Sequence, residues 1–255
     1  MKESIETMKN AIAAVLGDNP AALYLYGSVV MDDFKLGWSD IDFLCLTQTS
    51  MTEEQTVALV SLRHDLTEKY PDNQYFRLFE GGILPLHVFL GKGSDKIVYW
   101  GTSGQKITDT YYFDSFSMYE LISDGVLLYG NDVRGQLTLP AFEQLKNDVI
   151  RHYQTIRKYA VKTNESIYSC GWMLDIARGI YTLRTGKVIA KTAAGEWALK
   201  ENICPAAETL SKVIEVRKNP QQYKNSDSFN KWASTLGKDI QVFADVLEHE
   251  IQQAS

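Results

Sequence analysis

Residues 23–46, LYLYGSVVMDDFKLGWSDIDFLCL, decide the fold of the first half of this chain. The apolar run before Gly27 predicts a buried strand, and Gly27 itself allows the backbone to turn tightly and approach a ligand closely. Ser28 adds a hydroxyl, and the backbone N–H groups around it can form a nest for phosphate oxygens. A second strand is expected over Ile41–Leu46. The order is therefore strand, Gly-Ser loop, strand.

Two carboxylates, Asp40 and Asp42, stand where the second predicted strand begins. Their spacing has the period of a strand, so both side chains leave the same face. Paired hard oxygen anions suit Mg²⁺, which takes its other ligands from water and nucleotide phosphates. Alone, the two residues are better explained as a capping aspartate and a solvated strand-end aspartate. Together with the Gly-Ser loop, they favour a nucleotide and metal site.

Composition limits the classes of function. The chain has 255 residues, 45% of them hydrophobic, and this length fits one or two domains. The net charge of −6 provides no basic footprint, so we expect no nucleic-acid partner. No apolar run is long enough for a bilayer, and residues 1–17 form an amphipathic helix pattern rather than a signal peptide. Few, widely spaced cysteines indicate reduced thiols, so we expect a cytoplasmic protein without membrane partners, with a monomer favoured.

The pattern along the chain predicts two domains, residues 1–137 and 138–255. The first alternates helix and strand, including a helix over residues 50–70 whose Thr52 and Gln55 have capping-box spacing. Residues 73–91 indicate two strands around a Gly81-Gly82 turn. After Pro140, four segments are helical by period: residues 141–160, 166–186, 192–202 and 228–253. The fold class is therefore a mixed α+β core with a mixed β-sheet and flanking helices, followed by an all-α helical bundle.

Residues 26–46, YGSVVMDDFKLGWSDIDFLCL, resemble the signature of the polymerase-β-type nucleotidyltransferase superfamily. The resemblance implies that Gly27 and Ser28 hold the triphosphate of ATP. It also implies that Asp40 and Asp42 bind Mg²⁺ and act in catalysis. Membership of the superfamily does not define the acceptor substrate, because the same core serves many reactions.

Residues 174–205, LDIARGIYTLRTGKVIAKTAAGEWALKENICP, are similar to the helical C-terminal domain of the spectinomycin/streptomycin adenylyltransferases, the aminoglycoside 3″ and 9 group. The resemblance implies that Arg178 and Lys191 contact the triphosphate and that Tyr223 contacts the nucleotide. Glu196 either binds a cationic antibiotic or supports a turn. The competing interpretation of Arg178 and Lys191 is an ordinary solvated helix face.

The family carries a third carboxylate in a Leu-Glu-Val-type strand, where it acts as the base. The corresponding stretch here is LPLHVFL, residues 84–90, which places His87 at that position. Three interpretations stay open. His87 is the base, because an imidazole titrates near neutral pH. Glu80 substitutes, although a Gly81-Gly82 hairpin would hold it about 13 Å from the level of His87. In the third, transfer is lost and nucleotide binding remains.

The resemblance implies an adenylyltransferase that moves AMP from ATP–Mg²⁺ to a hydroxyl of a small molecule, an aminoglycoside or aminocyclitol such as spectinomycin. Streptomycin is disfavoured, because the acid and histidine that bind it in the family fall near Tyr168 and Gly171. The alternative is a catalytically impaired nucleotide-binding or regulatory protein that kept the fold.

Overall fold

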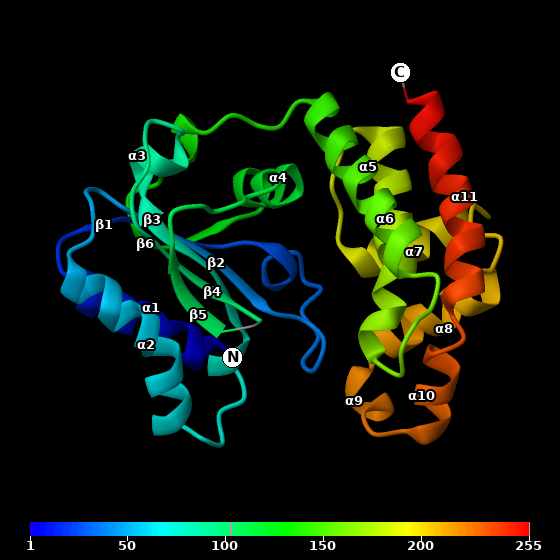
Figure 1. Ribbon diagram of the computed structural model, residues 1–255, viewed down its shortest axis with the longest axis horizontal. Coiled ribbons are helices and arrows are strands. Elements are labelled where there is room, and N and C mark those ends of the chain that lie inside the picture. The colour runs from blue at the N-terminus through cyan, green and yellow to red at the C-terminus, as the bar shows by residue number, and fades with distance from the viewer. Residues whose placement is uncertain (103, 255) are drawn as a thin grey trace. The chain divides into compact units, whose positions relative to one another are not determined.

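The computed structural model describes residues 1–102 and 104–254, and the chain forms two compact units (Figure 1). The α/β unit comprises Met1–Val30, Asp40–Phe113 and Glu120–Leu139, and the helical unit comprises Met31–Ser39, Asp114–Tyr119 and Pro140–Ser255. The fold class predicted from the sequence is confirmed. Two short segments expected in the first domain, 31–39 and 114–119, instead group with the helical unit.

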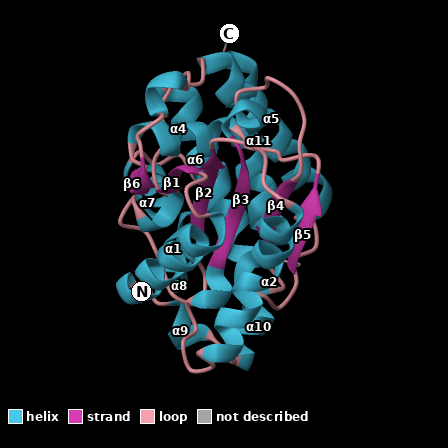
Figure 2. Cartoon of the chain, turned by 90° about the vertical axis from the view of Figure 1, so that its left-hand side faces the viewer, coloured by secondary structure: helices cyan, strands magenta, loops and turns pink. Residues whose placement is uncertain are grey.

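A six-stranded mixed sheet forms the centre of the α/β unit, in the order β5-β4-β3-β2-β1-β6. Strands β2 and β3 pair in parallel, and the other neighbours pair antiparallel. In Figure 2, α1 and α2 lie in front of the sheet and cover one of its faces. The elements of this part of the chain are α1 (Lys2–Leu16), β1 (Pro20–Leu25), β2 (Ile41–Thr47), α2 (Glu53–Lys69), β3 (Phe79–Pro85), α3 (Leu86–Phe89), β4 (Ile97–Gly101), β5 (Gly104–Thr108), α4 (Ser115–Ser123) and β6 (Val126–Gly130).

Local sequence signals account for most of these elements. The capping box predicted from Thr52 and Gln55 is present at the start of α2, where each residue's side chain bonds the other's backbone N–H. The β1 and β2 strands are buried along most of their length, as the two apolar runs predict. Trp100 and Phe43 pack edge to face at 5.1 Å between ring centroids, within the core on the side of α2.

The predicted hairpin at Gly81-Gly82 is wrong. Residues 79–85 are one straight run of β3, which lies inside the sheet between β2 and β4. A Cβ on Gly81 would lie 1.9 Å from the Phe43 carbonyl oxygen, and one on Gly82 would lie 2.7 Å from the Tyr111 ring. The two glycines therefore mark close approach of a neighbouring backbone and an aromatic ring within a strand. Pro85 is tolerated because it is the last residue of β3.

The helical unit is built around α6, whose face toward the interior is fully buried at Met173, Ile176 and Ile180. Gly195 on α7 lies against α6, since a Cβ there would be 2.9 Å from the Leu174 side chain. The predicted helix over residues 228–253 is two helices, and a further helix, α8, was not predicted. The helices are α5 (Phe142–Tyr159), α6 (Gly171–Thr185), α7 (Lys191–Lys200), α8 (Ala207–Lys218), α9 (Pro220–Tyr223), α10 (Asp227–Ala233) and α11 (Gly237–Gln253).

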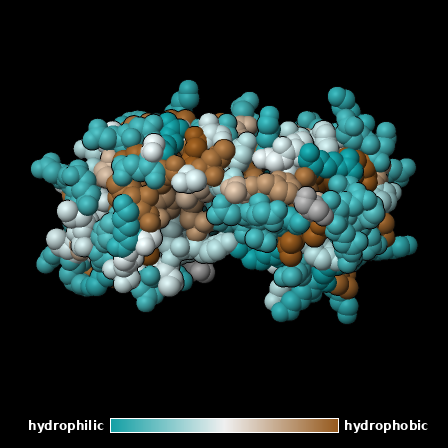
Figure 3. Space-filling model, turned by 90° about the horizontal axis from the view of Figure 1, so that it is seen from above, coloured by the Kyte–Doolittle hydropathy of each residue, from teal (hydrophilic) through white to brown (hydrophobic). Residues whose placement is uncertain are grey.

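The face of the molecule seen from above is mostly polar (Figure 3). Teal hydrophilic residues dominate the view in Figure 3, with brown apolar patches among them. Within the described residues, none of the helices has the length and apolar character needed to cross a membrane. Cys45, Cys170 and Cys204 are free and buried, as the sequence predicts, and burial raises the pKa of the Cys45 thiol to about 12.

Candidate active site

The Gly-Ser turn that follows β1 packs closely against the side chain of Asp42. Gly27 has φ of +71°, and a Cβ there would lie 2.3 Å from Asp42 Oδ2. The backbone N–H of Tyr26 donates to the Asp42 carbonyl at 3.1 Å, so β1 and β2 remain paired up to this point. Ser28 follows within a short 3-10 turn, Gly27–Val29. Only glycine combines this conformation with space for the carboxylate.

A third carboxylate lies beside Asp42. In the parallel pairing of β2 and β3, Asp42 is the partner of Glu80 and Ile41 is the partner of Phe79. Paired residues of neighbouring strands lie about 4.8 Å apart and point to the same face. Asp40 directly precedes β2, and its charge acts together with that of Glu80 on both Arg63 and Tyr99. The structure therefore gathers Asp40, Asp42 and Glu80 at one end of the sheet.

The placement of His87 beside the aspartates is wrong. His87 lies in α3, which begins directly after β3 ends at Pro85. The step from Glu80 to Pro85 spans about 16 Å of strand, so α3 begins at the opposite end of β2 from Asp42. The His87 ring lies near Gly93, 3.8 Å from the position of a Cβ there. The turn expected from the sequence at Gly81-Gly82 would have taken Glu80 out of the strand. Glu80 in fact lies within β3.

Polar groups hold Glu80 and supply positive charge nearby. The Tyr99 hydroxyl donates to Glu80 Oε1 at 2.8 Å. Burial, together with that bond and the charge of Glu80, raises the pKa of Tyr99 to about 12, so the hydroxyl stays a donor at neutral pH. Burial lowers the pKa of Arg63, which the charges of Glu80 and Asp40 oppose. Its guanidinium donates to the carbonyls of Phe79 at 2.7 Å and Gly101 at 2.9 Å.

Two buried tyrosines line the same end of the sheet. Burial raises the pKa of Tyr26 well above its ordinary value, and the neighbouring Tyr111 and Asp42 raise it further. Burial likewise raises the pKa of Tyr111, whose ring packs 5.9 Å from that of Tyr99. Both hydroxyls therefore remain protonated beside the carboxylates. These roles could not be assigned from the sequence, because Tyr26 follows β1, Tyr111 follows β5 and Arg63 lies on α2, and only the tertiary fold brings the three together.

The carboxylates fit a Mg²⁺ ion that completes its coordination with a nucleotide. Across residues 1–102 and 104–254, no three His, Cys, Asp or Glu side chains form a ready-made metal site. Mg²⁺ does not require one, because it is commonly held by one or two carboxylates together with substrate phosphates and water. Asp40 and Asp42 provide carboxylate oxygens of this kind.

In the helical unit, Arg178 and Lys191 are brought together around Asp175. The Lys191 ammonium, at the start of α7, forms an ion pair of 2.8 Å with Asp175 Oδ1. Burial raises the pKa of Asp175, but the charges of Lys191 and Arg178 outweigh it and hold that pKa below its ordinary value. The Arg178 guanidinium lies 5.0 Å from the centre of the Phe116 ring. This cluster retains positive charge for an anionic ligand.

His152 completes the cluster. Its ring stacks on Phe116 with centroids 6.2 Å apart. Burial lowers its pKa, with Arg178 and Lys191 acting in the same direction and Asp175 opposing. The imidazole is therefore neutral at pH 7.

Two residues predicted for the site lie elsewhere. Glu196 is exposed on α7 and pairs with the ammonium of Lys218, which is an ordinary surface arrangement. Tyr223 ends α9, and its hydroxyl donates to Glu215. The hydrogen bond to the Glu215 carboxylate raises the pKa of Tyr223, so the hydroxyl stays protonated and donates to Glu215. The structure provides no geometric support for either predicted role.

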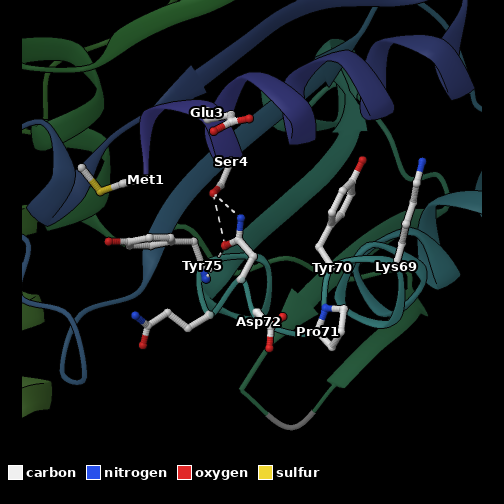
Figure 4. A pocket seen from close by; sticks show the side chains of 10 residues that line it. Met1, Glu3, Ser4, Lys69, Tyr70, Pro71, Asp72 and Tyr75 are labelled. Carbon is white, nitrogen blue, oxygen red and sulfur yellow. Dashed lines mark hydrogen bonds between the residues drawn. The ribbon is translucent and has the colours of Figure 1, made fainter.

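A separate hollow of about 500 Å³ opens between the start of α1 and the segment before β3. The dashed lines at Ser4 in Figure 4 are hydrogen bonds between Ser4 and Asn73, which both line the hollow. The side chains of Tyr70 and Lys69 lie side by side in the same view (Figure 4). The walls contain none of the sheet carboxylates. The hollow is therefore distinct from the candidate active site.

Comparisons with known proteins find one matching family model and a similar solved structure. Residues 143–245 match the family model described as the aminoglycoside adenylyltransferase C-terminal domain. The chain is also similar in structure to spectinomycin adenyltransferase AAD(9) from Enterococcus faecialis, solved with ATP and spectinomycin. That match has a TM-score of 0.71 and 18% sequence identity, and covers 97% of this chain and 99% of the other. A search of curated proteins finds no match. The resemblance of the C-terminal part to the aminoglycoside adenylyltransferases is confirmed by the family model, and the fold of the whole chain is confirmed by the structural match.

Proposed function

We propose that this protein transfers AMP from ATP to a hydroxyl of an aminocyclitol of the spectinomycin type, with Mg²⁺ as the metal. The pairing of Asp42 with Glu80 across β2 and β3 carries the proposal. A third carboxylate beside the two that suit the metal supports the proposal, because the reaction needs a base. The similar structure of an adenyltransferase solved with ATP and spectinomycin supports both substrates.

In the proposed reaction, the acceptor hydroxyl oxygen bonds to the α-phosphorus of ATP. The bond from that phosphorus to the oxygen of the β-phosphate breaks, and pyrophosphate leaves with the electron pair. The hydroxyl proton passes to the Glu80 carboxylate, which the Tyr99 hydroxyl orients. Bound Mg²⁺ would neutralise phosphate charge as the leaving group departs. Gly27 and Ser28 seat the phosphates, and Arg178 and Lys191 contribute further positive charge.

The alternative is a catalytically impaired protein, and it rests on a histidine in place of the third carboxylate. The pairing of Asp42 with Glu80 supports the active enzyme over that alternative. Streptomycin remains disfavoured as acceptor. Tyr168 sits edge-on to Trp38 at 6.3 Å, and Gly171 packs against the same ring, so neither position offers a charged group. We expect a cytoplasmic monomer, consistent with the use of ATP.

Isothermal titration of ATP with and without Mg²⁺, followed by pyrophosphate release with spectinomycin or streptomycin, tests the proposal. We expect Mg²⁺-dependent ATP binding, and release with spectinomycin that Asp42→Asn abolishes. Absence of ATP binding would refute the proposal entirely. Binding without release on any aminocyclitol would favour a regulatory role instead.

A further inference from the structure

The segment between the Gly-Ser turn and the paired aspartates contains a buried charge. Asp33 is 4% exposed and Arg217 of α8 is 3% exposed. Arg217 Nη2 donates to Asp33 Oδ2 at 2.8 Å, and the guanidinium lies 5.3 Å from the centre of the Trp38 ring. Burying an ion pair costs several kcal/mol per ion before the mutual attraction offsets it. Apolar side chains could hold this segment against α8 without that desolvation cost. We therefore expect the ion pair to have a specific role.

The same carboxylate caps helix α7. The backbone N–H of Thr192 donates to Asp33 Oδ2 at 3.3 Å, and the Thr192 hydroxyl donates to Oδ1. The residue at the N-cap position of α7 is Ala190, which has no side-chain oxygen to accept these bonds. Asp33 therefore supplies from a distant part of the chain the acceptor that a helix start normally obtains locally. Its negative charge also suits the positive end of the helix.

Lys191 immediately precedes Thr192 and is the first residue of α7. The backbone position of Lys191 is thus set by the turn that Asp33 caps. Asp33 itself belongs to the loop that leads from Ser28 to Asp40. Two further contacts fix this loop in the helical unit: Gln221 donates to the Leu36 carbonyl at 2.9 Å, and Trp38 packs on Tyr168.

We infer that Asp33 is a positioning residue for nucleotide binding, which sets Lys191 by capping α7 through Thr192. The inference depends on the proposed function, since it assigns a cation to the phosphates of ATP. The Asp33–Arg217 pair holds the carboxylate in place, and the Thr192 bonds transmit that position to Lys191. One buried carboxylate thereby fixes both the loop after Ser28 and the lysine at the start of α7.

The test uses Thr192→Val, which removes the hydroxyl donor at nearly constant volume and leaves Asp33 and Arg217 paired. Thr192→Ser retains the hydroxyl. Thr56→Val is the matched control, because Thr56 is also a buried threonine, donates to the Thr52 carbonyl at 2.7 Å, and lies on α2. The measurements are the Kd for ATP with Mg²⁺ by calorimetry, the KM for ATP and for spectinomycin, and kcat, all well below the Tm of each variant.

We expect Thr192→Val to raise the Kd and KM for ATP about fivefold, the usual effect of one lost hydrogen bond, with the spectinomycin KM unchanged. Thr192→Ser should bind ATP as the wild type does, and Thr56→Val should lower only the Tm. If the wild type binds ATP and Thr192→Val binds it equally well, the positioning role is refuted, whatever the change in Tm. If the wild type binds no ATP, the proposed function itself fails.

Discussion

Gly27 and Gly91 have the same backbone conformation, with φ of +71° in both, but different surroundings. A Cβ on Gly27 would meet Asp42 Oδ2, whereas nothing lies within 4 Å of one on Gly91. Alanine in the left-handed region costs roughly 1–3 kcal/mol wherever it is placed. We expect Gly27→Ala to show this loss of stability and also to abolish ATP binding, because the Asp42 carboxylate must move.

Gly91→Ala is the matched control for this prediction. It should show a similar conformational cost in urea unfolding and wild-type ATP affinity by calorimetry. Equal ATP affinity in both variants would mean that the Asp42 carboxylate can be displaced without consequence, which contradicts the site described here.

Glu80 and His87 offer a second comparison at the same scale. Removing a general base typically lowers the rate 10²- to 10⁴-fold. We therefore expect Glu80→Gln to lower kcat by roughly 10²-fold or more while the folded protein remains, because the amide can still accept from Tyr99. His87→Gln should retain kcat within about twofold, since α3 begins beyond the far end of β3. A large loss in His87→Gln with an active Glu80→Gln would reverse the assignment.

Residue spacing alone predicted part of this site. The Gly-Ser turn and the period-2 aspartates are local patterns, and the structure places Gly27 against Asp42 as such a turn requires. Glu80 could not be assigned in the same way. Its role depends on its register with Asp42 across two strands separated by α2, and no local pattern specifies that register.

At the scale of elements, β3 shows how a composition signal can mislead. A Gly-Gly pair between apolar runs normally indicates a hairpin, and here it lies in the middle of a strand. The reason is tertiary: the Phe43 carbonyl and the Tyr111 ring approach too closely for any side chain. The sequence shows that Gly81 and Gly82 have no side chains, but it does not show which neighbouring groups occupy that space.

This interpretation predicts the behaviour of Gly81→Ala. Because its Cβ would lie 1.9 Å from the Phe43 carbonyl oxygen, β2 and β3 must separate locally. We expect a loss of roughly 1–3 kcal/mol, as for other overpacked interiors, with a lower Tm and weaker ATP binding. Gly135→Ala provides the control, since a Cβ there meets nothing within 4 Å. A Tm equal in the two variants would show that β2 and β3 are not packed this closely.

Helix α8 was missed because of the residue that matters most on it. Its buried face contains Val213, Val216 and Arg217, and an arginine interrupts the apolar period that identifies such a face. Arg217 is acceptable there only because Asp33 lies against it, 184 positions away in the sequence. Long-range charge pairing of this kind leaves no local signal.

At the scale of the molecule, the units do not follow the chain order that a single boundary implies. Segments 31–39 and 114–119 belong to the helical unit although the chain around them belongs to the α/β unit. The composition change near Pro140 marks where continuous helical sequence starts. It could not identify the two earlier segments, because side chains such as Asp33 and Trp38 join the helical core by long-range contacts.

The charge of Asp33 makes the stability of the protein depend on pH. Burial raises the pKa of Asp33, but Arg217 and Thr192 outweigh it and hold that pKa below its ordinary value. Because the folded-state pKa is lower than the unfolded one, the stabilisation is present above about pH 4 and is lost as pH falls through the folded-state pKa. Between pH 7 and pH 3, the free energy of unfolding measured with urea should decrease less for Asp33→Asn than for the wild type. For Asp124→Asn, a substitution at an exposed position, the free energy of unfolding should decrease by the same amount as for the wild type.

Binding of ATP with Mg²⁺, as proposed above, should stabilise the folded protein against heat. A ligand present at a hundredfold excess over its Kd stabilises the folded state by about 2.7 kcal/mol. For a chain of this length that corresponds to a rise in Tm of about 5–10 °C with ATP and Mg²⁺, which EDTA should largely remove. Asp42→Asn in the α/β unit and Arg178→Ala in the helical unit should each reduce the rise, measured by scanning calorimetry. Glu196→Gln, which alters only an exposed ion pair, should leave it unchanged. A full rise in Arg178→Ala would show that the helical unit does not contribute to nucleotide binding.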